Sequence, residues 1–121
     1  QCLVGSEMCI RDSTNTDDHL RNHAFLFADN GWKLSPLYDV NPVPYGDELS
    51  LLVDDRDNSI SIELAINTAN RFGIQREVAE NMAEEILTIV RNNWEKKAKE
   101  YDLSLGHIEY MLPAFDACYN K

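Results

Sequence analysis

The sequence predicts a mainly α-helical chain with one small β-hairpin. Apolar residues recur at three- and four-residue intervals through residues 75–100, which is the spacing of one face of a helix. Residues 61–73 carry a second, shorter helical pattern. Ahead of both, two short apolar runs flank Asn30-Gly31, a dipeptide typical of two-residue hairpin turns. These three observations define the predicted fold class.

The first part of the pattern is expected to be a polar loop followed by the hairpin. Residues 14–22 are polar, residues 24–27 form a short apolar run, and residues 32–37 return after the turn. Pro36 removes a ladder hydrogen bond from the returning strand, which indicates an edge position. A connection rich in proline, glycine and aspartate follows, and residues 49–53 are predicted to form a short strand within it.

Local signals mark the ends of three helices. Ser61 is expected to cap the N-terminus of the first helix, and Gly73 its C-terminus. Ser104 is expected to cap a last short helix, which Pro113 disfavours extending. The long helix over residues 75–100 is predicted to bury an apolar stripe made of Val78, Met82, Ile86, Ile89, Val90 and Trp94.

The first thirteen residues differ in kind from the rest. They lack the basic start and the apolar run of a signal peptide. Residues 3–13, LVGSEMCIRDS, resemble the translation of a transposase adapter used in sequencing libraries. Residues 1–13 are therefore interpreted as a disordered assembly artefact. On this interpretation the natural reading frame continues upstream of Thr14, and residues 14–121 are a fragment of a larger protein.

Composition bounds the classes of function. The formal net charge is −10, and −9 without residues 1–13, which carry one basic and two acidic side chains. Phosphates repel such a chain, so a basic partner or binding through cations is favoured over direct contact with nucleic acid. Without residues 1–13 one cysteine remains, Cys118, which excludes an intrachain disulfide and indicates a cytoplasmic location. No apolar stretch is long enough to span a bilayer, so no membrane association is expected.

The polar loop contains a spacing that suggests phosphoryl transfer. Asp17 and Asn22 stand in the pattern D-x-x-x-x-N. In the catalytic loop of protein kinases the Asp of this pattern accepts the proton of the substrate hydroxyl, and the Asn holds a magnesium ion. If Asn30-Gly31 is a two-residue turn, an unbroken register places Asn22 opposite Asp39, with Cβ atoms roughly 5 Å apart. Two converging oxygen ligands suit Mg²⁺.

Two segments carry a family resemblance. NTDDHLRNHAF and GWKLSPLYDVNP resemble the C-terminal, helical lobe of HipA-like serine/threonine kinases, the toxins of type II HipA/HipB toxin–antitoxin modules. The resemblance implies a protein-kinase-like lobe with its catalytic loop and metal hairpin in residues 14–42 and its helical part in residues 61–121. It also implies a bacterial parent enzyme that transfers a phosphoryl group from ATP, with Mg²⁺, to a serine or threonine of a protein.

The resemblance further implies residue roles and partners. Asp17 would be the catalytic base, and Asn22 and Asp39 the ligands of Mg²⁺ and the nucleotide. His19 would be a catalytic residue that supports the loop or touches phosphate. The implied partners are the protein substrate and a HipB-like helix-turn-helix antitoxin, through which alone DNA would be contacted. The nucleotide-clamping loop and its lysine would lie upstream, so residues 14–121 by themselves are expected to be inactive.

Two other readings of the same residues stay open. A metal-dependent hydrolase would use Asp17, Asp18, His19 and His23, whose H-x-x-x-H spacing binds zinc when it lies on a helix. A non-catalytic helical module would bind a basic partner through its glutamate-rich faces. On the kinase reading, Asp18 is expected to be a solvated neighbour of Asp17 or a hydrogen-bonding group of the loop, and Arg21 to pair with Asp18, with a phosphate or with a surface carboxylate.

Overall fold

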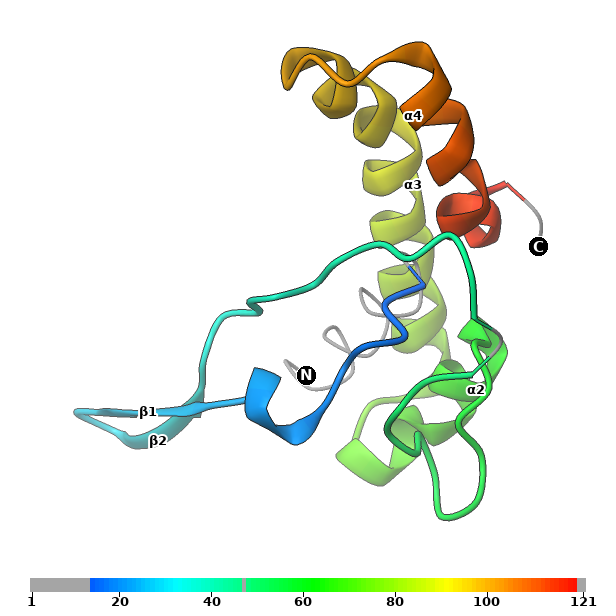
Figure 1. Cartoon of the computed structure of the whole chain (residues 1–121). Coiled ribbons are helices and arrows are strands. Elements are labelled where there is room, and N and C mark those ends of the chain that lie inside the picture. The colour runs from blue at the N-terminus through cyan, green and yellow to red at the C-terminus, as the bar shows by residue number, and fades with distance from the viewer. Residues whose placement is uncertain (1–13, 47, 120–121) are drawn as a thin grey trace.

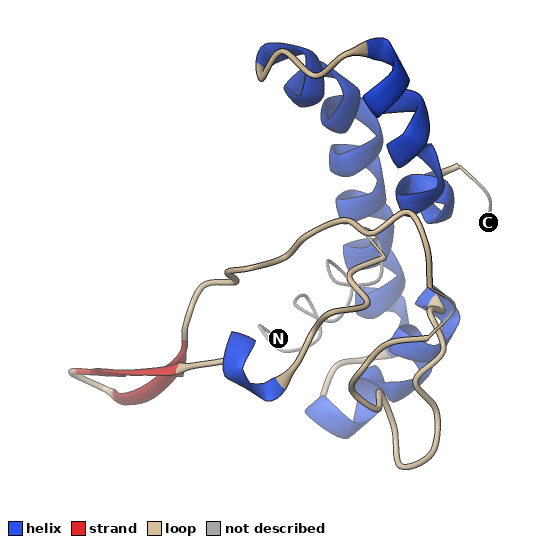
Figure 2. Cartoon of the chain, in the orientation of Figure 1, coloured by secondary structure: helices blue, strands red, loops and turns tan. Residues whose placement is uncertain are grey.

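A computed structural model describes residues 14–46 and 48–119. The adapter-like segment, residues 1–13, lies outside the described residues. The described part is about half helical and contains one two-stranded antiparallel sheet (Figure 1, Figure 2). The predicted class, mainly α with a small hairpin, is confirmed. None of the described helices is long and apolar enough to cross a bilayer.

The longest helix, α3 (Arg76–Glu100), is the spine of the molecule. Helix α2 (Ile62–Thr68) continues as a 3-10 helix, Ala69–Phe72, and packs at the lower end of α3 (Figure 1). Helix α4 (Leu105–Met111) continues as a 3-10 helix, Leu112–Cys118, and runs back along the upper part of α3.

The predicted helix ends are confirmed. The Ser61 hydroxyl accepts a hydrogen bond from the Leu64 N–H at 3.2 Å, and Gly73 ends the helical segment in the left-handed region with φ 73°. The Ser104 hydroxyl accepts a hydrogen bond from the backbone N–H of His107, in the first turn of α4, at 3.3 Å. Pro113 does not end the helical segment, which continues beyond α4 as a 3-10 helix. The proline lies in the first turn of this 3-10 helix, where a missing N–H breaks no bond.

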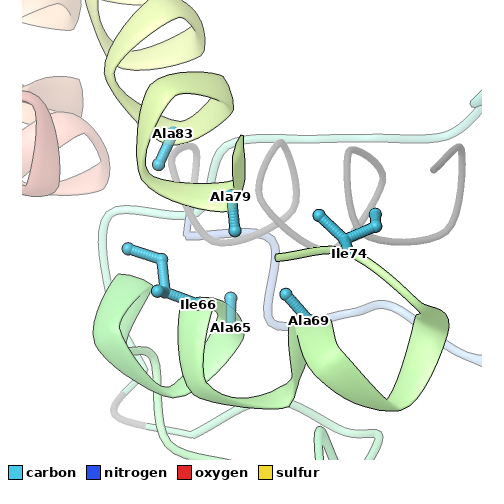
Figure 3. Packing of buried hydrophobic residues seen from close by; sticks show 6 residues of the cluster. All are labelled: Ala65, Ile66, Ala69, Ile74, Ala79 and Ala83. Atoms are coloured by element: carbon cyan, nitrogen blue, oxygen red, sulfur yellow. The ribbon is translucent and has the colours of Figure 1, made fainter. Parts of the chain in front are cut away.

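The predicted buried stripe of α3 is confirmed in part. Trp94 is buried, and Met82, Ile86 and Val90 are half-buried and packed against the core. The buried residues of α3 are Ala79, Ala83, Leu87 and Trp94, whereas Val78 and Ile89 are 42% and 55% exposed. The predicted stripe consists of larger apolar side chains and contains neither Ala79 nor Ala83. The helix instead turns its alanines inward, because small residues let α2 approach closely (Figure 3).

Two clusters of buried residues make up the core along α3. The first joins α2 and the start of α3 through Ala65, Ile66, Ala69, Ile74, Ala79 and Ala83 (Figure 3). The second joins α3 to the C-terminal helices. Its centre is the ring of Trp94, which stacks on Phe115 at 4.3 Å between centroids and 16° between planes. The indole N–H of Trp94 donates to the Tyr119 hydroxyl at 2.9 Å.

The hairpin forms with a different register from the predicted one. Strand β1 (Phe25–Ala28) pairs with β2 (Gly31–Leu34), and Ala28 faces Gly31, so the central turn residues are Asp29 and Asn30. Gly31 alone in the turn has a positive φ, 104°. The expected type I′ turn needs positive φ at both central residues, and this turn instead places its glycine one position later. The predicted register is therefore wrong.

The hairpin extends away from the helices (Figure 1, Figure 2). Phe25, Phe27 and Trp32 are exposed on it, and the rings of Phe27 and Trp32 meet edge to face at 5.3 Å. Strand β2 ends before Pro36, with one further bond from the Ser35 N–H to the Ala24 carbonyl at 2.8 Å. Pro36 therefore follows the strand rather than lying within it.

The predicted strand at residues 49–53 is not observed. Glu48 forms an isolated bridge with Ser59, and the next residue, Leu49, is buried. The Asp54 carboxylate accepts hydrogen bonds from the backbone N–H groups of Arg56 and Asp57, both at 2.8 Å. This local capping turns the chain back on itself and competes with an extended strand.

Arg76 connects the two helices at the lower end of the molecule. Its guanidinium donates to Glu63 of α2 at 2.8 Å, to Glu80 of α3 at 2.7 Å and to the side-chain oxygen of Asn67 at 2.6 Å. The hydrogen bond from Arg76 lowers the pKa of Glu63 below its ordinary value of 4.5. The same hydrogen bond to Glu63, followed by that to Glu80, raises the pKa of Arg76.

Replacing Trp94 by alanine is expected to lower the free energy of unfolding by about 3–5 kcal/mol, because the change empties the centre of the second cluster. Trp94→Phe keeps an aromatic ring and loses the hydrogen bond to Tyr119, so a smaller loss of about 1 kcal/mol is expected. Urea denaturation measures both. Trp32→Ala, the same change at an exposed tryptophan, is the matched control and should cost about 0.2–1 kcal/mol. Equal losses at the two tryptophans would contradict this account of the core.

Acidification tests the link through Arg76. A carboxylate whose pKa is depressed in the folded state stabilises it above the unfolded pKa, and this contribution is lost as the pH falls through the folded pKa. Wild type is therefore expected to exceed Glu63→Gln in stability at neutral pH, with the difference shrinking below pH 4.5. Urea denaturation between pH 7 and pH 3 measures it. Glu85→Gln, an exposed change elsewhere on α3, is the control; a Glu63→Gln difference that is independent of pH would refute the link.

Candidate functional site

The loop that carries the predicted site is tied to the body of the molecule at its start. The Thr14 hydroxyl donates to the carbonyl of Ala114 at 3.0 Å, and the Ser50 hydroxyl donates to the carbonyl of Thr16 at 2.6 Å. Gly46 lies against the same loop with φ 110°, and a Cβ there would come within 2.8 Å of the Thr16 methyl group. Residues 14–16 are thus held between two segments far away in the sequence.

Neighbouring side chains of this loop face opposite environments. Asn15 and Asp18 are buried, at 1% and 4% exposure, whereas Asp17 is exposed. The predicted catalytic base therefore presents its carboxylate to solvent on a tethered backbone. Accessibility of this kind is what a base needs if it is to reach a proton on a separate substrate.

Asp18 has a specific partner, which the sequence did not indicate. Its two carboxylate oxygens each lie 3.0 Å from Nε2 of His23. The expectation that Asp18 is solvated is wrong, whereas its alternative, a hydrogen-bonding role within the loop, agrees with the structure. A carboxylate withdrawn from water needs a compensating donor, and His23 supplies it. Arg21, the other candidate partner, is exposed.

His19 and Asn22 lie at the two ends of one short turn. The 3-10 helix Leu20–Asn22 begins after His19, whose backbone is extended, and the Asn22 N–H donates to the His19 carbonyl at 2.8 Å. Asn22 is buried, at 8% exposure. Nδ1 of His19 is buried and has no hydrogen-bond partner within the described residues.

Asp39 is exposed and has a left-handed backbone, with φ 56°. Its carboxylate accepts a hydrogen bond from the Asn41 side chain at 2.7 Å. Continuing the observed register beyond the hairpin puts Leu37, not Asp39, across from Asn22. The predicted direct opposition of Asn22 and Asp39 is therefore wrong, because it depended on the turn at Asn30-Gly31.

The segment that carries Asp39 nevertheless lies beside the loop that carries Asp17 and Asn22. The Tyr38 hydroxyl donates to the carbonyl of Arg21 at 2.7 Å. The residues immediately before Asn22 and Asp39 are therefore joined. Neither Tyr38 nor the tethers at Thr14 and Ser50 were singled out from the sequence, because a side-chain bond to a distant carbonyl leaves no spacing pattern.

The geometry does not favour a zinc site. His19 and His23 lie in extended backbone on either side of a single 3-10 turn, not on one face of an α-helix. Nε2 of His23 already faces Asp18. Within residues 14–46 and 48–119, no three histidine, cysteine, aspartate or glutamate side chains converge to hold a metal ion.

A cleft of about 750 Å³ lies beside the start of the loop. It is lined on one side by Thr14 and Gly46 and on the other by α2, α3 and the C-terminal segment. Apolar side chains and carboxylates share its walls, and they include Ile60, Ile62, Ile66, Leu87, Glu63, Glu80, Glu84 and Asp116. Asp17, Asn22 and Asp39 are not among its lining residues.

Comparison with known protein families identifies one match. A family model described as HipA-like C-terminal domain matches residues 12–94. The matched range includes Asp17, His19, Asn22 and Asp39, and it runs through α2 into α3 as far as Trp94. Searches of curated proteins and of solved structures returned no match.

Gly46→Ala is expected to destabilise the chain by about 1–3 kcal/mol, because the new Cβ needs an unfavourable backbone conformation and meets the Thr16 methyl. Gly106→Ala is the matched control. It lies in α4 with open space around it, and alanine should stabilise that helix by about 0.5–1 kcal/mol. Urea denaturation measures both changes. Effects of the same sign would show that the contact between Gly46 and Thr16 does not shape the loop.

Proposed function

The chain belongs to the HipA-like C-terminal domain family, and from this premise we propose that it is the C-terminal part of a serine/threonine protein kinase. The proposed reaction transfers the γ-phosphoryl group of ATP to a hydroxyl of a protein, with Mg²⁺. The observation that carries the proposal is the contrast within D-x-x-x-x-N: Asp17 is exposed, whereas Asn22 is buried at the end of a tethered turn. One residue is thereby free to meet a substrate and the other is held in place.

Asp17 is proposed as the base that accepts the proton of the attacking hydroxyl. Asn22 and Asp39 are proposed to hold Mg²⁺. Their donor set fits this ion, which prefers oxygen ligands and takes one or two from the protein, with water and phosphate oxygens completing its shell. When bound, the ion neutralises the phosphate charge, which an acidic chain cannot do by itself. His19, at the start of the same turn, is proposed to support the loop.

The partners follow from the family and are part of the proposal. They are a protein substrate and a HipB-like helix-turn-helix antitoxin, through which the complex would contact DNA. The net charge of −10 supports this division, because phosphates repel the chain itself. The whole protein would then act as the toxin of a type II module.

The competing hydrolase finds less support. It needs Asp17, Asp18, His19 and His23 around one metal ion. Asp18 and His23 are hydrogen-bonded to each other, and no three such side chains converge within the described residues. Asp17 is on the solvent side of the loop while Asp18 is buried. A kinase needs no ligand from either histidine.

Asp17→Asn tests the proposal in the full-length protein encoded by the reading frame that contains this chain. The rate of phosphoryl transfer from ATP to a protein should fall roughly 10²- to 10⁴-fold, because the amide cannot accept the proton. ATP affinity should be unchanged, since Asp17 is not a proposed metal ligand. Asp39→Asn should instead raise the Mg²⁺ concentration needed for half-maximal ATP binding. Radiolabel transfer and calorimetry measure the two effects.

Asp29→Asn, the same exchange at an exposed aspartate of the hairpin turn, is the control and should leave both quantities unchanged. An Asp17→Asn protein that keeps its transfer rate would remove Asp17 from the mechanism. A full-length wild-type protein that neither binds ATP with Mg²⁺ nor transfers phosphate would overturn the proposed function itself.

A further inference from the structure

We infer that Asp18 and His23 form a clamp that positions Asp17 and Asn22 for phosphoryl transfer. The inference rests on the proposed function, because it assigns the clamp to the same site. Asp18 directly follows the proposed base, and His23 directly follows the proposed metal ligand Asn22. A bond between Asp18 and His23 therefore controls how far apart the two functional groups lie.

The bond itself is well defined. Both oxygens of Asp18 lie 3.0 Å from Nε2 of His23, and the two side chains are 6% and 19% exposed. A carboxylate can only accept hydrogen bonds, so Nε2 must carry the hydrogen. This contact sets the orientation of the imidazole ring and selects the protonated nitrogen.

The clamp adds a side-chain contact to a turn whose two backbone hydrogen bonds differ in length. The bond from the Asn22 N–H to the His19 carbonyl is 2.8 Å, and the one that reaches His23 is longer. The 3-10 helix Leu20–Asn22 is a single turn, and its bond from the His23 N–H to the Leu20 carbonyl is long, at 3.3 Å. Such short 3-10 segments have poorer hydrogen-bond geometry than an α-helix. The contact between Asp18 and His23 spans the same turn from one side to the other and so stabilises its shape.

The other side-chain hydrogen bonds of the loop have a different effect. Ser50 holds the carbonyl of Thr16, and Tyr38 holds the carbonyl of Arg21. Each fixes one point of the loop to a neighbouring segment, and neither joins the side of the loop that carries Asp17 to the side that carries Asn22. The pair Asp18–His23 joins these two sides directly.

The clamp residues are thus positioning residues, which act through Asp17 and Asn22. Removal of a group that hydrogen-bonds to and orients a functional residue typically lowers activity 10- to 100-fold. His23→Ala in the full-length protein is therefore expected to lower kcat roughly 10- to 100-fold and, through Asn22, to raise the Mg²⁺ concentration needed for half-maximal ATP binding. His23→Gln returns an amide N–H donor of similar reach and should recover most of the loss.

Two further variants separate positioning from simple loss of stability. Asp18→Ala and His23→Ala should each lower kcat, and the double variant should be no worse than the more damaging single one, because both remove the same contact. His107→Ala is the matched control for the histidine change. It lies exposed near the start of α4 and should leave kcat unchanged. Circular dichroism on every variant shows that the fold is kept.

A spectroscopic readout tests the clamp without depending on catalysis. In the chain itself, labelled with ¹⁵N-histidine and observed by nuclear magnetic resonance at neutral pH, the His23 ring should show a hydrogen on Nε2. Asp18→Asn should shift the His23 ring signals and leave those of His107 in place. His23 signals that do not respond to Asp18→Asn would overturn the clamp.

The remaining outcomes are distinct from one another. A clamp seen by resonance, together with a His23→Ala enzyme of unchanged kcat, overturns the positioning role and leaves the proposed function standing. A full-length wild-type protein without phosphoryl transfer overturns the proposed function and the positioning role together, while the resonance result still decides whether Asp18 and His23 are joined. Loss of kcat with recovery in His23→Gln supports the inference.

Discussion

The stack of Trp94 on Phe115 is the interaction on which the candidate site depends. It holds the 3-10 helix Leu112–Cys118 against α3, and the Ala114 carbonyl of that helix accepts the hydrogen bond from Thr14. The site loop therefore starts from a packed core and not from a free end. A loop needs such support, because functional side chains must be held to within a fraction of an ångström of their working positions.

Two adjacent aspartates, Asp17 and Asp18, lie in different environments and therefore have different structural roles. Asp17 faces solvent, and Asp18 is buried against His23. Burial obliges Asp18 to keep a donor and so makes it part of the scaffold, while Asp17 keeps its accessibility. In an acidic chain this division also limits the charge that faces the phosphates of a nucleotide, whose approach requires a cation.

Two of the wrong predictions from the sequence have separate physical sources. The hairpin register changed because Gly31 follows the central pair of the turn instead of belonging to it, and a shift of this kind displaces every residue beyond the turn. Asp39 thus lost its place opposite Asn22. The buried face of α3 was predicted only in part, because Ala79 and Ala83 contribute little to a hydrophobicity pattern. Their small size nevertheless permits the close approach of α2.

What the sequence by itself determined is local in origin. The mainly helical class, the caps at Ser61, Gly73 and Ser104 and the D-x-x-x-x-N spacing all depend on residues within a turn or two of each other. The family was also indicated by sequence alone, through two segments within the matched residues 12–94. Only the tertiary structure decided which face of α3 is buried and how residues 14–16 are anchored. It alone also paired Asp18 with His23. These features depend on which surfaces meet and which groups lose water, and neither is fixed by neighbours along the chain.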